Sequence, residues 1–150
     1  MKLRTACFGN IEIDPAGIIH FPGGVPGFED CRRFVLLQRP EEAPVAWLQG
    51  VDDPDLAFAV VEPRHFLAEY HPPLSPADLE PLKLAAGEEA LILIILVLAP
   101  EPERITANLQ APVIINRKEK LGAQVYLGED WPRKYYLFPN VEKKAAGHNN

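Results

Sequence analysis

Side chains that could act as nucleophiles are scarce in this sequence. Ser75 is the only serine, and it stands just before Pro76 and three residues before Asp78, where its hydroxyl would cap a short helix. No G-x-S-x-G motif is present. Cys7 and Cys31 carry no catalytic signature, and without a secretory signal we expect both thiols to be reduced. The residue inventory therefore disfavours a serine, threonine or cysteine hydrolase.

Metal-binding patterns are equally weak. The 4 histidines show no H-x-x-x-H spacing, and the 2 cysteines form no C-x-x-C pair. His65 and His71 are close in sequence, so a site assembled by the fold stays open at this level. The acidic run 52–55 resembles the start of a calcium loop but lacks the glycine and the distal glutamate of such a loop. We expect an acidic turn there, with Asp side chains capping the backbone, and we predict no metal or cofactor.

A glycine-rich segment, 23–27, invites comparison with phosphate-binding loops. It has no Walker sequence, and Pro26 removes one of the backbone N–H groups that such a loop would use. We expect its glycines to adopt positive φ in a tight turn that presents Phe28.

Adjacent carboxylates are abundant, for example Glu29 with Asp30. General acid–base catalysis would need two of them facing each other in a cleft with different pKa values, which sequence spacing does not show. The favoured interpretation is a solvated acidic rim that attracts a cationic protein surface. The acidic candidates for partner contact are Glu29, Asp52, Asp53, Asp55, Glu69, Glu101 and Glu103.

The overall charge points away from nucleic acid. The chain holds 15 Lys and Arg against 21 Asp and Glu, a net charge of −6, whereas proteins that bind nucleic acid through phosphates usually have the opposite balance. Basic residues gather at 117–120 and at 133–134, the latter beside Tyr135 and Tyr136. Stacking on bases is one interpretation, but a solvated turn and an amphipathic edge strand are favoured. A basic protein partner suits this chain better than RNA or DNA.

Short apolar runs separated by 16 Pro and 10 Gly predict strands rather than long helices. A hairpin turn is predicted at 14–17 and a buried central strand at 91–98. The other expected strands lie near 7–13, 18–21, 34–37, 45–49, 56–61, 105–109, 113–115 and 123–127.

The expected fold is mostly β: a small antiparallel β-barrel-like single domain with one short helix near 76–84. We expect the domain to span 1–140 and residues 141–150 to form a polar, frayed tail. The longest apolar run, 91–99, is far shorter than the ~20 residues of a membrane-spanning helix, so we predict no membrane insertion.

Four segments resemble the flagellar assembly factor FliW family. They are F-P-G-G-V-P-G-F-E at 21–29, W-L-Q at 47–49 leading to D-P at 53–54, F-A-V-V-E-P at 58–63, and T-A-N-L-Q-A-P-V-I-I-N at 106–116. The last is similar to the family's N-L-x-A-P-x-x-x-N signature. The resemblance covers about 8–137 in one register.

The resemblance implies a cytoplasmic, non-enzymatic regulator that binds flagellin and the RNA-binding translational repressor CsrA. In this family flagellin occupies FliW until it is exported; free FliW then binds CsrA and relieves repression of flagellin translation. We expect a monomer. Two alternatives stay open: a flagellin chaperone without CsrA binding, and a small-ligand-binding β-barrel or carboxylate-using enzyme.

The resemblance also suggests where partners bind. Amphipathic helices of flagellin would need an apolar groove, and the aromatic candidates for its lining are Phe28, Trp47, Phe58, Phe66 and Tyr70. Asn108 and Asn116 belong to the signature and are candidates for partner contact. The favoured interpretation of these two amides is structural, namely that they brace the turns around Pro112.

Overall fold

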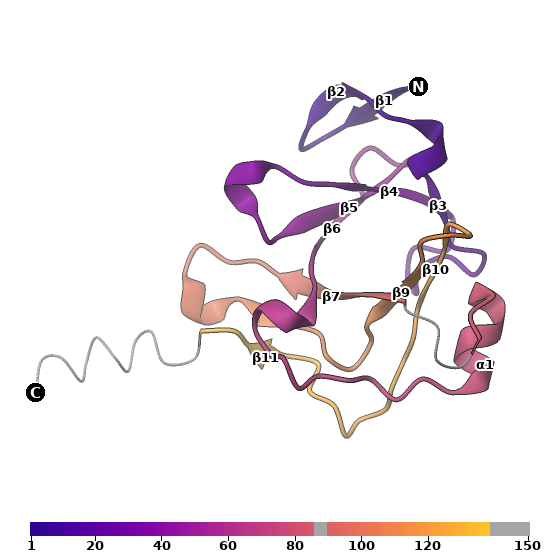
Figure 1. Ribbon diagram of the computed structural model, residues 1–150. Helices are drawn as coiled ribbons and strands as arrows, with labels where there is room; N and C mark the ends of the chain where they lie inside the picture. The colour runs from indigo at the N-terminus through magenta and orange to yellow at the C-terminus, as the bar shows by residue number, and fades with distance from the viewer. Residues whose placement is uncertain (86–89, 139–150) are drawn as a thin grey trace, which may run out of the picture.

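Seven strands close a β-barrel in the computed structural model, which describes residues 1–85 and 90–138 (Figure 1). Their order around the barrel is β7-β6-β5-β4-β3-β10-β9, and pairing of β9 with β7 closes the ring. The strands are β3 (Ile19–His20), β4 (Arg33–Leu37), β5 (Ala46–Gly50), β6 (Ala57–Val61), β7 (Leu91–Val97), β9 (Val113–Asn116) and β10 (Leu121–Gln124). Neighbours are antiparallel except β3 and β10, which form one parallel bridge. The predicted antiparallel barrel is therefore confirmed, with one parallel pair; the predicted tail lies outside the described residues.

Closure of the barrel takes place on β7. Its first three residues pair with β9, its middle with β6, and its end with the short strand β8 (Thr106–Ala107). A strand with neighbours on two sides and both faces covered suits an unbroken apolar run better than alternation. The predicted central strand is confirmed, and Leu93, Ile94 and Leu96 are buried. The apolar run extends beyond the buried part of the strand, however, because Val97 is 63% and Leu98 45% exposed.

Further strands lie outside the barrel. β11 (Tyr135–Tyr136) pairs with β8 and is the edge of the nine-stranded sheet, as predicted for an edge strand here. β1 (Lys2–Thr5) and β2 (Gly9–Glu12) form a separate hairpin at the N-terminal end (Figure 1).

The predicted hairpin turn at 14–17 is wrong. The first hairpin reverses earlier, where Thr5 Oγ1 donates to the carbonyl of Gly9, whose φ is +68°. Asp14 instead caps the 3₁₀ helix Pro15–Gly17 by accepting a backbone N–H. An Asp-Pro pair sets the first φ of a helical turn as readily as that of a β-turn, and the chain then continues into β3.

The helix predicted near 76–84 is present and ends slightly earlier. α1 (Pro76–Leu79) begins with a full capping box: the N–H of Asp78 donates to Ser75 Oγ at 3.2 Å, and the N–H of Ser75 donates to Asp78 Oδ2 at 2.9 Å. The 3₁₀ helix Glu80–Leu82 follows, and Lys83 stops it with φ +55°. No helix in the described residues is long and apolar enough to cross a membrane.

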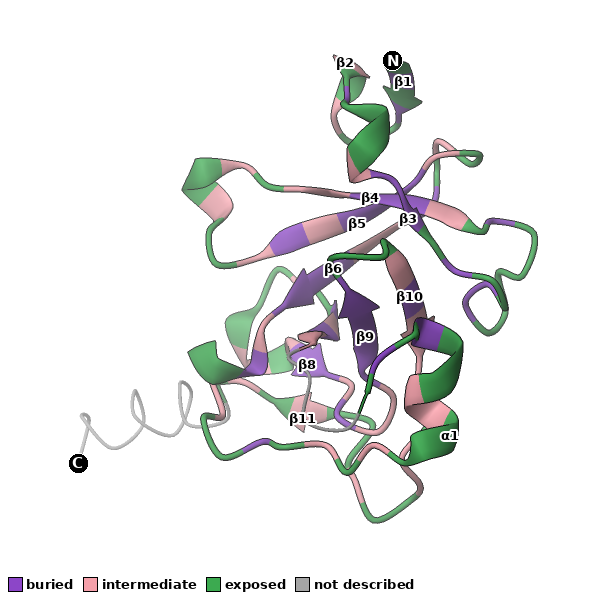
Figure 2. Cartoon of the chain, turned by 45° about the vertical axis from the view of Figure 1, so that its right-hand side comes forward, coloured by how far each residue is buried: buried purple, intermediate pink, exposed green. Residues whose placement is uncertain are grey.

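Side chains fill the barrel and also cover its outside. Phe21, Phe34 and Leu48 have no exposed surface and lie in the interior cluster. Gly122 in β10 is needed here, because a Cβ at this position would lie 2.6 Å from the ring of Phe21. The outward side of β6 and β7 packs beneath later loops, including Tyr70. Figure 2 shows β9 buried along its length and the connecting turns largely exposed.

Candidate functional site

Two loops that are distant in sequence meet in a surface hollow of about 360 Å³. One follows β3 and the other joins β5 to β6. Eight residues line the hollow: Gly27, Phe28, Glu29, Asp30, Cys31, Asp52, Asp53 and Leu56. We name it the acidic hollow, because four of these residues are carboxylates. Among the residues predicted from sequence for partner contact, the fold thus brings together Phe28, Glu29, Asp52 and Asp53.

Glycines shape the first loop and turn Phe28 outward. Gly24 and Gly27 have φ of +69° and +88°, which side chains rarely adopt. The N–H of Phe28 donates to the carbonyl of Val25 at 2.7 Å, and the N–H of Gly27 donates to Glu29 Oε2 at 2.7 Å. The expected tight turn that presents Phe28 is confirmed, because this residue is 46% exposed.

An aromatic contact fixes this loop to the barrel. The ring of Phe28 meets that of Phe58 on β6 edge to face, with centroids 5.5 Å apart. Phe58 in turn lies 6.2 Å from Phe34 in the barrel interior. One side of the Phe28 ring is therefore anchored while the rest faces solvent.

A buried amide holds the second loop. Gln49 has no exposed surface, and its Nε2 lies 3.1–3.4 Å from four carbonyl oxygens, those of Gly50, Asp53, Pro54 and Leu56. The amide has two N–H groups, so they are shared among the four acceptors. Gln49 Oε1 finds no hydrogen-bond partner among the described residues. This residue fixes the path of the chain that carries Asp52 and Asp53, and the sequence signal for it was a polar side chain at the end of an apolar strand.

Close contact between the two loops depends on Gly50. A Cβ there would lie 2.9 Å from Cys31 Sγ. The predicted acidic turn is confirmed at 52–55, where the N–H of Asp55 donates to Asp53 Oδ1 at 3.0 Å.

Charge in the hollow is only partly balanced. Arg33 donates from Nε to Asp52 Oδ2 at 3.0 Å and from Nη2 to Oδ1. These hydrogen bonds lower the pKa of Asp52 and raise the pKa of Arg33 from their ordinary values. Glu29, Asp30 and Asp53 take part in no ion pair within the described chain. The hollow therefore keeps unneutralised negative charge beside an exposed aromatic ring.

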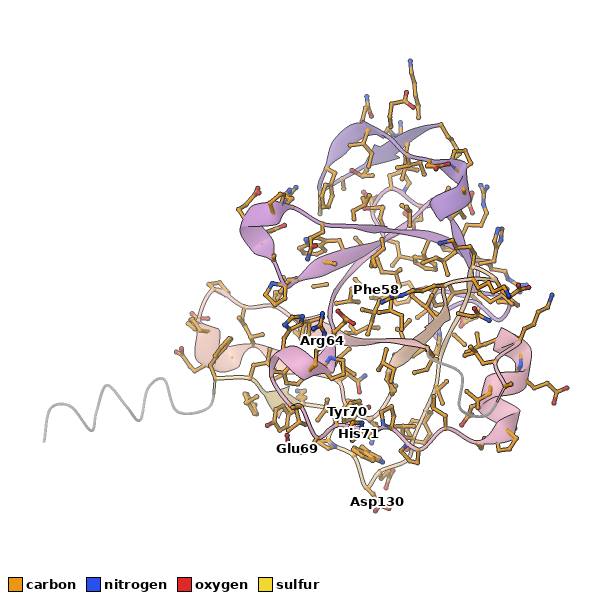
Figure 3. All side chains as sticks on the ribbon, viewed as in Figure 1. Phe58, Arg64, Glu69, Tyr70, His71 and Asp130 are labelled. Carbon is orange, nitrogen blue, oxygen red and sulfur yellow. The ribbon has the colours of Figure 1, made fainter. Side chains whose placement is uncertain are left out.

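Tyr70 is a core residue. It is 4% exposed, its hydroxyl donates to the carbonyl of Leu109 at 2.7 Å, and its ring packs edge to face on Trp131 at 5.2 Å. Burial raises the pKa of Tyr70 to about 12. Figure 3 shows Glu69, Tyr70 and His71 together on one segment, well separated from Phe58. A side chain this buried offers no surface to a partner, whereas its neighbour Glu69 is exposed.

The single aromatic groove expected from sequence does not form. Phe28 and Phe58 belong to the hollow side, whereas Phe66, Tyr70 and Trp47 pack into the cluster on the outward face of β6 and β7. Trp47 is half-buried and its Nε1 donates to Glu42 at 3.2 Å. Successive side chains along a strand point to opposite faces, and this alternation separates Trp47 on β5 from Leu48 in the barrel interior.

The two signature asparagines brace turns. Asn108 Oδ1 accepts the N–H groups of Gln110 and Ala111. Asn116 is 5% exposed, and its Nδ2 donates to the carbonyl of Leu82 at 2.8 Å while its Oδ1 accepts two backbone N–H groups. These bonds use the amides within the chain and support the structural interpretation.

Glu101 and Glu103 lie away from the hollow. They sit on the turn between β7 and β8, which includes the 3₁₀ helix Pro102–Arg104. This turn and the loop that contains Phe28 are on opposite sides of the molecule in Figures 1 and 2. The acidic candidates therefore do not form one continuous rim.

The arrangement offers little to acid–base or metal chemistry. A general acid needs a carboxyl pKa raised by its surroundings, whereas that of Asp52 is lowered. His65 and His71 are exposed, and the described residues contain no group of three His, Cys, Asp or Glu that could hold a metal ion. What the hollow can do is attract a cation and pack against an aromatic ring.

Comparison with known proteins gives a consistent result along the chain. The family described as "FliW protein" matches residues 2–137. The chain is similar to flagellar assembly factor FliW of Geotalea uraniireducens, 36% identical over 148 residues, covering 98% of this chain and 90% of the relative. It is 39% identical over 152 residues to that of Thermoanaerobacter pseudethanolicus, covering 100% and 99%. A crystal structure of the flagellar assembly factor FliW matches with a TM-score of 0.87 and 37% identity, covering 94% of this chain and 99% of that one.

Proposed function

The chain belongs to the FliW family of flagellar assembly factors, and we propose that it acts as a protein-binding regulator rather than as an enzyme. It binds flagellin in the cytoplasm. When flagellin is exported, the free protein binds the translational repressor CsrA and relieves repression of flagellin translation. Binding of one partner excludes the other.

The acidic hollow carries this proposal. Phe28, which is exposed, stands beside three carboxylates that form no ion pair within the described residues, and the whole chain has a net charge of −6. An RNA-binding protein presents a basic surface, and opposite charges raise the rate of encounter. We place the CsrA contact at the hollow.

The barrel interior gives the alternative functions less support. Phe21, Phe34 and Leu48 fill it without exposed surface, whereas a ligand-binding barrel keeps a chamber there. The carboxylates of the acidic hollow lie at the surface of the molecule, outside the barrel interior.

Calorimetric titration with CsrA at low and moderate salt tests the proposal. We expect binding that weakens with salt, and that is lost when flagellin is present. Asp53→Lys should weaken binding about tenfold, while Glu41→Lys makes the same charge change on an exposed turn elsewhere and should have little effect. Flagellin binding without CsrA binding would reduce the function to a flagellin chaperone, and binding of neither would refute the proposal.

A further inference from the structure

Exposed apolar side chains gather at one corner of the molecule. Val97 and Leu98 at the end of β7 are 63% and 45% exposed, and Tyr136 and Phe138 at β11 are 49% and 46% exposed. The other large exposed apolar residues of the described chain are Met1, Phe28 and Tyr126, which belong to three different segments. A gathering of this kind usually marks an interaction surface.

Strand register places Val97 and Tyr136 on one face. Val97 lies opposite Thr106, and Thr106 lies opposite Tyr136, so the three form one row across β7, β8 and β11. The next row, Leu96, Ala107 and Tyr135, turns inward: Leu96 and Ala107 are buried, and Tyr135 packs against Phe66. The outward row therefore places two exposed side chains, Val97 and Tyr136, on either side of Thr106, which is buried.

The same corner has an open strand edge. β11 pairs with β8 and with no other strand of the described chain. The N–H of Leu137 donates to the carbonyl of Ile105 at 3.3 Å, so in an antiparallel ladder residues 135 and 137 direct their backbone groups to β8. By the same alternation the N–H and C=O of Tyr136 point away from β8, toward the free edge. An unpaired donor and acceptor in this geometry are what an added strand uses.

Charges mark the two ends of the edge. Arg133 and Lys134 are exposed just before β11. Glu101 and Glu103 lie on the turn that precedes Ile105, the residue bonded to Leu137 beyond β11. None of these four side chains forms an ion pair in the described part of the chain. The charges of an added segment therefore complement the edge when the segment carries carboxylates at the Arg133 end and basic groups at the other end.

We infer that the edge of β11 docks an extended segment of a protein partner, which pairs with Tyr136 as an added strand and lays apolar side chains on Val97 and Phe138. The inference rests on the proposed function, which supplies two partners. The acidic hollow suits the basic one, CsrA. The single aromatic groove that helices of flagellin would need does not form, so flagellin is assigned to the edge through an extended segment instead. Because the hollow and the edge lie apart (Figures 1 and 2), mutual exclusion must then arise through the barrel or from the bulk of the bound protein.

Two substitutions at one residue separate the backbone from the side chain. Tyr136→Pro removes both the ring and the outward N–H, whereas Tyr136→Thr removes the ring and keeps the N–H. Titrated with purified monomeric flagellin, the proline variant should bind about tenfold more weakly than the threonine variant. Val97→Glu, at an exposed position, should also lose flagellin binding, and Tyr126→Ser, with 62% exposure outside this corner, should not.

CsrA titration of the same variants serves as the control for folding, because the hollow should be unaffected. Hydrogen exchange gives a readout independent of any variant: the Tyr136 amide should exchange freely in the unbound protein and become protected when flagellin binds. Equal flagellin binding by wild type and Tyr136→Pro would overturn the inference and leave the proposed function standing. Loss in Val97→Glu with proline and threonine equal would overturn strand addition. Wild-type protein that binds CsrA but not flagellin would overturn the assignment of the edge, and binding of neither partner would refute the proposed function itself.

Discussion

The acidic hollow and the β11 edge are built in different ways. The hollow consists of two loops held together by side chains: the amide of Gln49, the pair of Arg33 and Asp52, and the contact of Phe28 with Phe58. The edge is a direct extension of the barrel sheet, positioned by backbone pairing. The hollow presents charged side chains on loops, whereas the edge presents backbone groups and apolar side chains on a β-strand. Loss of a single side chain should therefore distort the conformation of the hollow far more readily than that of the edge.

The largest expected effect comes from the glycine that shapes the hollow. Gly24→Ala should lower the free energy of unfolding by about 3 kcal/mol, because strained backbone and steric overlap add together. Its φ is +69°, and a Cβ would lie 2.7 Å from the Cα of Glu29. Gly9→Ala is the matched control, with φ of +68° and nothing within 4 Å of its Cβ, and should cost only about 1 kcal/mol. Chemical denaturation measures both, and equal losses would show that overlap at Glu29 is unimportant.

The next effect concerns the buried amide. Gln49→Leu leaves four loop carbonyls without their shared donor and should cost about 2 kcal/mol of stability. It should also weaken CsrA binding while flagellin binding persists, since the edge does not depend on this loop. Gln124→Leu is the control, because Gln124 is half-buried and its Nε2 donates to one carbonyl, that of Ala111, at 3.0 Å. If Gln49→Leu left CsrA affinity unchanged, the loop would not need its amide for recognition.

Salt should separate the two surfaces. Raising the salt concentration from about 50 to about 500 mM should weaken CsrA binding roughly tenfold, because exposed charges at the hollow are screened. Flagellin binding should change less than about twofold, since apolar burial and backbone pairing carry it. Titration calorimetry at the two concentrations measures this, and equal salt dependence for both partners would contradict the division.

The smallest effect is the pH dependence of the pair formed by Asp52 and Arg33. Hydrogen bonds from Arg33 lower the pKa of Asp52 in the folded state. The pair thus adds stability above the unfolded pKa, which is about 4, and loses it as the pH falls through the lowered folded pKa. Both side chains are over 40% exposed, so Asp52→Asn should cost less than about 1 kcal/mol at pH 7. Denaturation at several pH values should show this difference vanishing in acid; a difference that grew in acid would contradict the assignment.

Local sequence signals account for much of the fold. Sequence alone predicts three elements, because capping and burial follow from short-range patterns. They are the Ser75-Pro76 start of α1, the apolar run of β7 and the edge strand at Tyr135. The turn at Asp14 was misread, since Asp followed by Pro suits both a β-turn and a 3₁₀ helix and only the pairing of the next strand decides.

Long-range contacts explain what sequence reasoning missed at the candidate site. Gln49 is recognisable as a polar residue at the end of an apolar strand, but no local signature shows that its amide reaches carbonyls up to seven residues further on. The approach of Cys31 that Gly50 allows has no local signature either. The partition of the aromatic residues into two clusters depends on strand alternation within a closed barrel. The resemblance named the family, but the meeting of Phe28 with Asp53 in one hollow required the structure.

Two variants, each titrated with both partners, test most directly the claim that this protein has two separate partner surfaces. Calorimetric titrations of a Glu29→Lys/Asp53→Lys double variant and of Val97→Glu, each with CsrA and with monomeric flagellin, give four affinities. We predict that the double variant loses CsrA and keeps flagellin, and that Val97→Glu loses flagellin and keeps CsrA. Loss of both partners in each variant, with both proteins folded, would show a single shared surface and contradict the account.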